Sequence, residues 1–157
     1  MEKRKIEIEY ELAQFDDFCS IGKQLIEEAR RATERSYAPY SHFCVGAAIR
    51  LDNGEIVTGA NQENAAYPSG TCAERSACFY AGAQYPGVKF DAIAIAARGT
   101  DGQFTPEPVA PCGACRQSLL EYEKLAGRSV KVILVGRDYC YVFPSVASLL
   151  PLCFADF

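Results

Sequence analysis

Three cysteines and one glutamate are the residues of this sequence best suited to chemistry on a metal ion. Cys112 and Cys115 have the i, i+3 spacing, and Cys72 lies earlier in the chain. Helical positions i and i+3 lie about 60° apart around the helix axis, so both thiols can reach one ion. Thiolates bind Zn²⁺ well, and three protein ligands leave a fourth position for water. Glu74, just after Cys72, could accept the proton of such a water.

The cysteines are expected near the beginnings of two helices. Proline and glycine flank Cys112, and Cys72 follows a Pro-Ser-Gly-Thr stretch. Helix N-termini carry unpaired N–H groups and partial positive charge, which favour a thiolate over a thiol. Three thiolates on Zn²⁺ leave a net negative charge that makes a bound water less acidic. Arg75 and Arg116 are close enough in sequence to offset that charge.

The residues alone leave other interpretations open. A Cys-x-x-Cys pair can be a zinc site, a redox pair or a coincidence. A thioredoxin-like pair explains neither Cys72 nor Glu74, and a structural four-cysteine site requires a further ligand such as Cys78 or Cys140. Cys78 falls about 240° around the helix from Cys72, which favours a buried apolar role. Glu74 could be an acid that interacts with the helix dipole, and His42, the single histidine, is expected to be structural.

The pattern around these residues predicts an α/β domain in which helices flank a sheet. Asn-Gly between two apolar runs is typical of a β-hairpin. Residues 98–111 form a loop, and 6–12 form a short strand or an extended lead-in. We expect helices at 15–35, 72–84 and 112–124, strands at 43–51, 55–60, 88–97, 130–136 and 139–143, and a helical turn at 145–150.

Length and composition favour one domain spanning 1–157, with 1–14 as a lead-in segment and a core at about 15–155. No apolar run approaches the roughly 20 residues of a membrane span. The first residues alternate charged and apolar types and lack the apolar core of a secretory signal, so we expect a cytoplasmic protein. The eight cysteines then favour free thiols or metal ligands. The net charge of −4 argues against a nucleic-acid partner.

Cys72-Ala73-Glu74 followed by Pro111-Cys112-Gly113-Ala114-Cys115 resembles the three-cysteine signature of the zinc nucleoside deaminases. Four blocks are similar to small cytidine deaminases: SHFCVGAA (41–48), NQENAAYP (61–68), TCAERSA (71–77) and PCGACRQ (111–117). The resemblance covers about residues 15–155. It implies a three-layer α/β/α sandwich with a five-stranded mixed sheet, and one zinc per subunit on Cys72, Cys112 and Cys115.

The resemblance also implies an activity, the hydrolytic deamination of cytidine and 2′-deoxycytidine to the uridines with release of ammonia, as in pyrimidine salvage. Glu74 is then the catalytic residue that carries the proton from water to N3 and helps the amine leave. By position in the family pattern, Phe43 packs against the base, Asn61 and Glu63 bind the ribose hydroxyls, and Ala73 belongs to the same substrate-binding set.

Further residues take roles around this site in the same way. Arg75 matches the family's arginine that hydrogen-bonds the zinc thiolates, and Gln117 is expected to support that network. Small cytidine deaminases are homotetramers whose pockets borrow residues from neighbouring subunits, and Tyr67 and Phe154 occupy the matching positions. Two departures from the pattern are Cys44, where many relatives carry proline, and a slightly expanded loop near 98–111.

Three competing functions follow from the same motifs. A deaminase of another cytosine nucleoside, such as blasticidin S, can share the residues around Asn61 and Glu63. A deaminase acting on nucleic acid usually has histidine in the first zinc motif and needs a surface for phosphates, whereas this chain has Cys72 and an acidic balance. A zinc-stabilised binding module without catalysis predicts a closed four-ligand site with no need for Glu74.

Overall fold

A single mixed sheet of six strands forms the centre of the computed structural model, which describes residues 1–155. The strand order is β1-β6-β5-β4-β2-β3, and the β4–β5 pair is parallel whereas the other pairs are antiparallel. The strands are β1 (Glu11–Gln14), β2 (Phe43–Leu51), β3 (Ile56–Ala60), β4 (Phe90–Gly99), β5 (Lys131–Val135) and β6 (Tyr139–Phe143).

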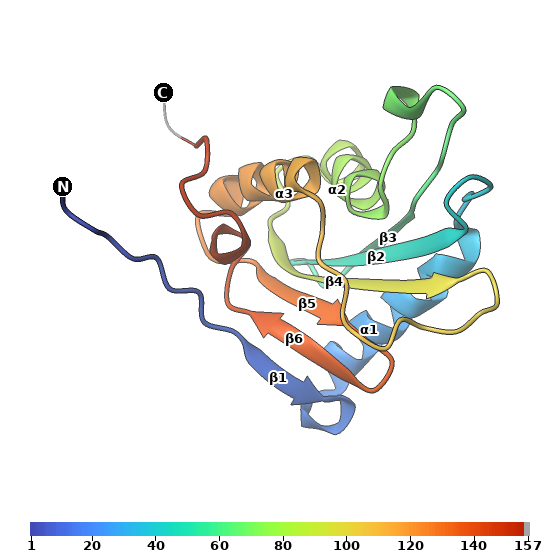
Figure 1. Ribbon diagram of the computed structural model, residues 1–157, viewed down its shortest axis with the longest axis horizontal. Coiled ribbons are helices and arrows are strands. Elements are labelled where there is room, and N and C mark those ends of the chain that lie inside the picture. The colour runs from blue at the N-terminus through green and yellow to red at the C-terminus, as the bar shows by residue number, and fades with distance from the viewer. Residues whose placement is uncertain (156–157) are drawn as a thin grey trace.

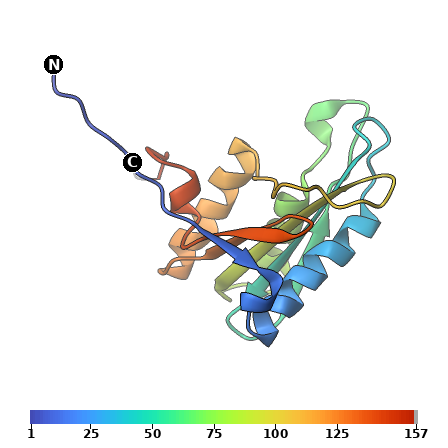
Figure 2. The same cartoon turned by 60° about the horizontal axis from the view of Figure 1, so that its bottom comes forward.

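Helices cover both faces of this sheet (Figures 1 and 2). Helix α1 (Ser20–Ala32) packs on one face, and α2 (Ala73–Gln84) and α3 (Gly113–Ala126) pack on the other. Each face has its own core of buried apolar side chains, with Leu25 and Ile26 of α1 in one and Leu119 of α3 in the other. The predicted three-layer α/β/α arrangement is confirmed.

The sheet has one strand more than the five expected. Residues Glu11–Gln14, which we assigned to the lead-in, pair with β6 and form the edge strand β1. Leu12 lies opposite Tyr141, and Ala13 lies opposite Cys140, so the alternating pattern of the lead-in continues the two faces of the sheet. This pairing joins segments near the two ends of the chain, so it cannot be predicted from the residues of either segment alone.

The first helix is shorter than the expected range 15–35. A 3-10 turn at Phe15–Asp17 precedes it, and another at Thr33–Arg35 follows it. The backbone of Phe18 is extended, with φ −84° and ψ 140°, which separates the first turn from α1. The remaining elements match the expected ones to within a few residues, and the Asn53-Gly54 hairpin is confirmed, with φ of +90° at Gly54.

Two glycines allow the helices to lie directly on the sheet. A Cβ at Gly46 would meet the carbonyl oxygen of Ala29 in α1 at 2.2 Å, and one at Gly59 would meet that of Ala73 in α2 at 2.5 Å. Since Ala73 is the first residue of α2, Gly59 sets how closely the beginning of that helix approaches the sheet. Among the described residues, none of the helices combines the length and apolar character that crossing a membrane requires.

Candidate metal centre

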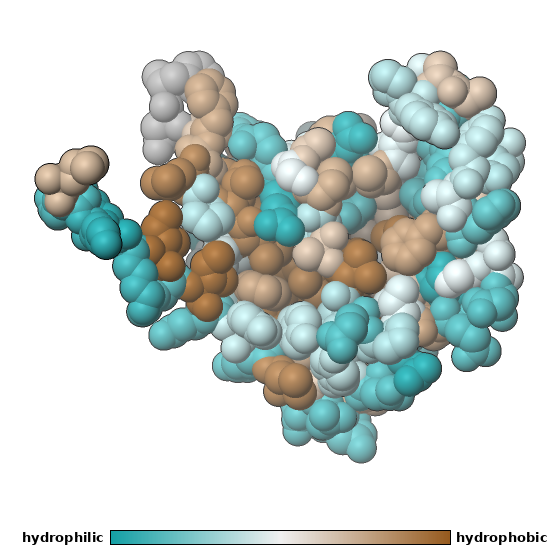
Figure 3. Space-filling view, viewed as in Figure 1, coloured by the Kyte–Doolittle hydropathy of each residue, from teal (hydrophilic) through white to brown (hydrophobic). Residues whose placement is uncertain are grey.

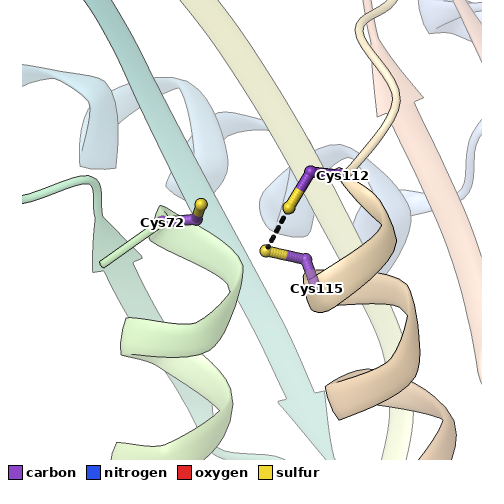
Figure 4. Close-up of side chains that lie close together, drawn as sticks. All are labelled: Cys72, Cys112 and Cys115. Atoms are coloured by element: carbon purple, nitrogen blue, oxygen red, sulfur yellow. Dashed lines mark hydrogen bonds between the residues drawn. The ribbon is translucent and has the colours of Figure 1, made fainter. Parts of the chain in front are cut away.

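The first turns of α2 and α3 bring three cysteine sulfurs together (Figure 4). Cys72 immediately precedes α2, Cys112 immediately precedes α3, and Cys115 lies in the first turn of α3. Their Sγ atoms all lie within 4.8 Å of one another, and those of Cys112 and Cys115 are 3.5 Å apart. Tetrahedral zinc with Zn–S bonds of about 2.3 Å requires sulfurs about 3.8 Å apart. The trio therefore fits one zinc ion.

Both helix starts have the geometry that favours negative charge on sulfur. Cys72 and Cys112 are extended N-cap residues, and their carbonyl oxygens accept the first helical N–H bonds, from Ser76 and Arg116 at 3.0 Å each. The free N–H groups and the helix dipoles of both first turns therefore lie beside the sulfurs.

One of the three sulfurs is anionic even without metal. Hydrogen bonds from Cys115, Arg75 and Cys112 together lower the pKa of Cys72 to about 5, against the opposing effect of burial. The same contact with Cys72, together with burial, raises the pKa of Cys115. Cys72 thus carries the thiolate of the metal-free pair and Cys115 retains a proton, which a metal ion displaces when it binds.

Glu74 lies in the first turn of α2 with only 4% of its surface exposed. Burial raises the pKa of its carboxyl group, and the charge of Cys72 adds to the effect. Within residues 1–155 its buried Oε2 has no hydrogen-bond partner. A buried carboxylate oxygen without a partner is costly in a folded protein, and beside a metal-binding trio it is positioned for a water or a substrate. This feature supports the fit of a catalytic zinc ion.

A cavity of about 470 Å³ opens beside the cluster, between residues 40–41 and 61–75. Its lining includes Asn61, Glu63, Tyr67, Cys72 and Arg75. Small-molecule sites usually measure about 300–1,000 Å³. The structure therefore brings five sequence-predicted site residues together around a space of suitable size.

Asn61 uses its side chain to hold the beginning of β2. Its Oδ1 accepts the N–H of Val45 at 2.8 Å, and its Nδ2 donates to the carbonyl of Phe43 at 2.9 Å. A primary amide has two N–H donors and two lone pairs on oxygen, so each end retains capacity for a ligand. Asn61 thereby fixes Phe43, the residue that the sequence places against the base.

Glu63 is held by backbone groups that the sequence analysis did not consider. Its Oε2 accepts the N–H groups of Tyr40 at 2.9 Å and Ser41 at 3.2 Å. A side-chain hydrogen bond from Ser41 lowers the pKa of Glu63. Ser41 Oγ also accepts the N–H of Phe43 at 3.1 Å, and His42 between them has a φ of +56°. Ser41 is the first residue of the block SHFCVGAA, which resembles the family, but the resemblance gave no role to Ser41 itself.

Of the two residues expected to support the thiolates, Arg75 and Gln117, only Arg75 contacts them among the described residues. Arg75 interacts with both Cys72 and Cys115. Gln117 does not take the expected position, because its Nε2 donates to the backbone carbonyl of Phe154 at 2.9 Å. Gln117 is about 200° around α3 from Cys115 and therefore points away from the cluster. This corrects the expectation that it supports the thiolate network.

The remaining predicted residues lie at identifiable places around the site. Ala73 is fully buried at the beginning of α2. Tyr67 is 75% exposed at the rim of the cavity, with its ring centroid 6.1 Å from that of Tyr40. Phe154 is 70% exposed. Arg116 donates from its guanidinium to the carbonyls of Pro111 and Leu149, and Pro111 is the neighbour of the ligand Cys112.

The cysteines considered as a fourth ligand lie elsewhere. Cys78 is buried in the core beneath α2, where burial raises its pKa to about 12. Cys140 is buried on the opposite face of the sheet, against α1. In the part of the chain that the structure describes, Cys72, Cys112 and Cys115 alone form a metal-binding group, which leaves a fourth zinc position open to other ligands.

Comparison with known proteins gives one consistent result. Residues 20–129 match the model of the cytidine and deoxycytidylate deaminase zinc-binding region. The cytidine deaminases of Sporosarcina psychrophila and Halalkalibacterium halodurans are each 42% identical, over 85% and 84% of this chain and 90% and 92% of theirs. The crystal structure of a cytidine deaminase from Burkholderia pseudomallei, 40% identical, matches with a TM-score of 0.68 over 83% of this chain and 97% of that one. The chain belongs to the cytidine and deoxycytidylate deaminase zinc-binding family.

Proposed function

We propose that the protein is a zinc-dependent cytidine deaminase, which hydrolyses cytidine and 2′-deoxycytidine to uridine and 2′-deoxyuridine and releases ammonia. The observation that carries this proposal is the buried Oε2 of Glu74, which has no hydrogen-bond partner among residues 1–155 and lies beside three metal-binding thiols. A metal site that serves only stability has no use for such a carboxylate. The similarity to cytidine deaminases over most of the chain supports the choice of substrate.

The zinc ion belongs on Cys72, Cys112 and Cys115, and when bound it supplies the Lewis acidity that makes water a nucleophile near neutral pH. Deamination adds a water oxygen to C4 of the cytosine ring and expels the exocyclic amine as ammonia. Glu74 accepts one proton of that water and passes it to N3. It then takes the remaining proton from the hydroxyl added at C4 and delivers it to the amine, so that the C4–N bond breaks, a C4 carbonyl forms and ammonia leaves. One carboxyl can serve both steps because burial raises its pKa toward the working range of an acid and a base.

The polar side chains of the cavity orient the nucleoside. Phe43 provides an apolar face for the base, while Asn61 and Glu63 bind ribose hydroxyls. Glu63 is suited to this role because its lowered pKa keeps it ionised and able to accept hydrogen bonds. Buried sugar hydroxyls require such partners, because each unpaired polar group costs about 1–3 kcal/mol.

A homotetramer accounts for the exposed aromatic side chains around the site. Tyr67 and Phe154 are both large, apolar and exposed in the single chain, and we propose that each reaches the pocket of a neighbouring subunit. Exposed Phe79 and Tyr80 of α2 and Leu125 of α3 add apolar surface for the same assembly. The cytoplasmic location and the absence of a nucleic-acid partner remain predictions from the sequence.

The test is an assay on purified protein whose zinc content is measured beside its activity. We expect one zinc per chain, and ammonia release with the cytidine-to-uridine absorbance change for both nucleosides. Blasticidin S and a cytosine-containing single-stranded oligonucleotide are run in parallel. Preferred turnover of blasticidin S would redirect the proposal to that substrate class, and zinc-loaded protein inert toward every substrate would reject catalysis.

A further inference from the structure

The first ten residues form an extended segment, the N-terminal arm, that continues from the edge strand β1. The ladder between β1 and β6 begins at Glu11, and residues 1–10 are all exposed. Figures 1 and 2 show the arm leaving the body of the molecule. The arm lies outside the region that matches the deaminase family, residues 20–129.

The arm alternates as a strand does. Its even positions include Ile6, Ile8 and Tyr10, and its odd positions from 3 to 9 are Lys, Lys, Glu and Glu. Successive side chains of an extended segment point to opposite faces, so residues 6–10 have one apolar face and one charged face. On the even face, the apolar residues are preceded by Glu2 and Arg4, which pair with each other. Within the single chain Lys5 pairs with Glu7 on that charged face.

The apolar side chains of the arm lie on the same side as the sheet face that carries α2 and α3, but they remain exposed to solvent. Tyr10 stacks on Phe143 with ring centroids 5.1 Å apart, whereas Ile6 and Ile8 are 55% and 46% exposed. A groove of about 480 Å³ separates this part of the arm from the C-terminal turn, whose Leu152 is 93% exposed. Figure 3 shows apolar surface between the two segments. Such an exposed apolar strip is typical of an interaction surface.

The order of charges specifies what fits against the arm. If a second copy lies antiparallel with Ile6 opposite Ile6, each Lys3 faces a Glu9 and each Lys5 faces a Glu7. Centring the pair on Glu7 or on Ile8 instead places glutamates opposite each other. A shift that sets odd against even positions brings the lysines and glutamates of the odd face beside Ile6 and Ile8. In the register centred on Ile6, the charged side chains of the even face are Arg4, opposite Ile8, and Glu2, opposite Tyr10, both toward the ends of the pair. The arm is therefore complementary to itself in one register.

We propose that two copies of this chain pair through their N-terminal arms, antiparallel and centred on Ile6. Strand β1 is one of the two edge strands of the sheet among the described residues, and the extended arm that continues it can accept another strand through its backbone. The pairing adds a ladder of backbone hydrogen bonds, four lysine–glutamate pairs and a contact between the two Ile6 side chains. The assembly requires no part of the deaminase site.

Disulfide trapping tests the register directly. Opposite residues of an antiparallel pair have Cα atoms about 4.5–5.5 Å apart, within the range that a disulfide spans. Ile6→Cys should therefore give a covalent dimer under mild oxidation, as seen on a non-reducing gel. Ile8→Cys is the matched control, because two Ile8 residues lie about 13 Å apart in this register. The unmodified chain controls for exposed Cys19. Equal trapping of both variants, or none at position 6, would overturn the proposal.

Charge exchange tests the complementarity, with Ile6→Cys present throughout. K3E/K5E makes odd positions 3 to 9 all acidic, and E7K/E9K makes them all basic, while Glu2 and Arg4 are unchanged. Each alone should form covalent dimer at least about tenfold more slowly, because like charges face each other. An equimolar mixture should restore trapping between the two types, and the fourfold exchange K3E/K5E/E7K/E9K should restore it within one protein. Arms of one sign that trap as fast as the parent would show that charge does not set the pairing.

Discussion

Gln117 donates its side-chain amide to the backbone carbonyl of Phe154 across 2.9 Å. One residue earlier on the same helix, Arg116 donates to the carbonyl of Leu149 at 2.7 Å. Helix α3 thus holds two metal-binding thiols at its beginning and the C-terminal segment along its side. Because Gln117 bonds to the main chain, it fixes the point from which the exposed Phe154 ring projects.

Gln117→Ala should therefore weaken substrate binding and leave the metal in place. Losing this hydrogen bond frees the segment that carries Phe154, so we expect KM for cytidine to rise several-fold with zinc content unchanged. Phe154→Ala should act in the same direction, and the double variant should be no worse than Phe154→Ala alone, since both act through one ring. Ser118→Ala on the same helix is the control. A loss of zinc in Gln117→Ala would instead assign this residue to the thiolate network.

Glu74→Gln should abolish turnover while zinc remains bound. The amide has nearly the same size but cannot accept and return a proton, and general acid–base catalysis contributes about 10²–10⁴-fold. We expect kcat to fall by at least about 10³-fold, because one residue serves two proton transfers. Glu121→Gln, an exposed residue of α3, is the matched control. Near-normal activity of Glu74→Gln would exclude the proposed mechanism.

Replacing any of the three clustered cysteines with serine should remove both zinc and activity. A hydroxyl is a far weaker zinc ligand than a thiolate, and two remaining thiols do not complete the site. Metal analysis by mass spectrometry should show less than one tenth of the parent's zinc, and melting in the presence of zinc should occur at lower temperature. Cys19→Ser, an exposed cysteine outside the cluster, should leave both unchanged. Full zinc occupancy in Cys112→Ser would show that the ion is held elsewhere.

The metal-free protein should contain one cysteine that reacts as a thiolate in mild acid. The pKa of Cys72 is lowered from 9.0 to about 5, so its alkylation should rise through about pH 5, whereas the unfolded chain follows a curve near pH 9. The pKa of Cys72 is lower in the folded protein than in the unfolded chain. Its contribution to the free energy of unfolding is therefore complete above about pH 9, falls as the pH decreases from 9 to 5, and is absent below about pH 5. Cys78, whose pKa is raised to about 12, serves as an unreactive internal control. Mass spectrometry of peptides alkylated across the pH range locates the site, and a Cys72 midpoint near 9 would contradict the assignment.

The sequence predicted the residues whose roles are set locally. Cys72, Cys112 and Glu74 lie in the first turns of helices, and their positions follow from motif spacing and helix geometry. The hairpin at Asn53-Gly54 follows equally from two adjacent residues. These features need no knowledge of distant contacts.

The features that the sequence did not predict depend on segments far apart in the chain. The pairing of β1 with β6 and the bond from Gln117 to Phe154 both join residues that come together only when the whole sheet forms. The sequence predicts that Asn61 and Glu63 bind the ribose. In the structure both side chains also hydrogen-bond to the backbone on either side of Phe43, at residues 40–41 and 43–45. A polar side chain with several donors and acceptors can serve both purposes, and residue type alone does not distinguish them.

Glu123 should prove important for stability although it lies outside the site. Its carboxylate, 8% exposed, accepts the N–H groups of Val130 at 2.8 Å, Val146 at 2.7 Å and Ala147 at 3.1 Å. Glu123→Ala leaves three backbone donors without their acceptor, and buried unpaired groups cost about 1–3 kcal/mol each. We expect a loss of about 3 kcal/mol or more in the free energy of unfolding, measured with urea on zinc-loaded protein.

Glu123→Gln keeps the size of the side chain and one acceptor oxygen, so it should lose roughly half as much. Glu121→Ala, at an exposed position of the same helix, controls for helix propensity and should change stability by less than about 0.5 kcal/mol. Since Val146 and Ala147 begin the segment that ends at Phe154, Glu123→Gln should also raise KM for cytidine. A Glu123→Ala variant as stable as Glu121→Ala would mean that these three N–H groups find water instead, and that the carboxylate does not anchor the C-terminal segment.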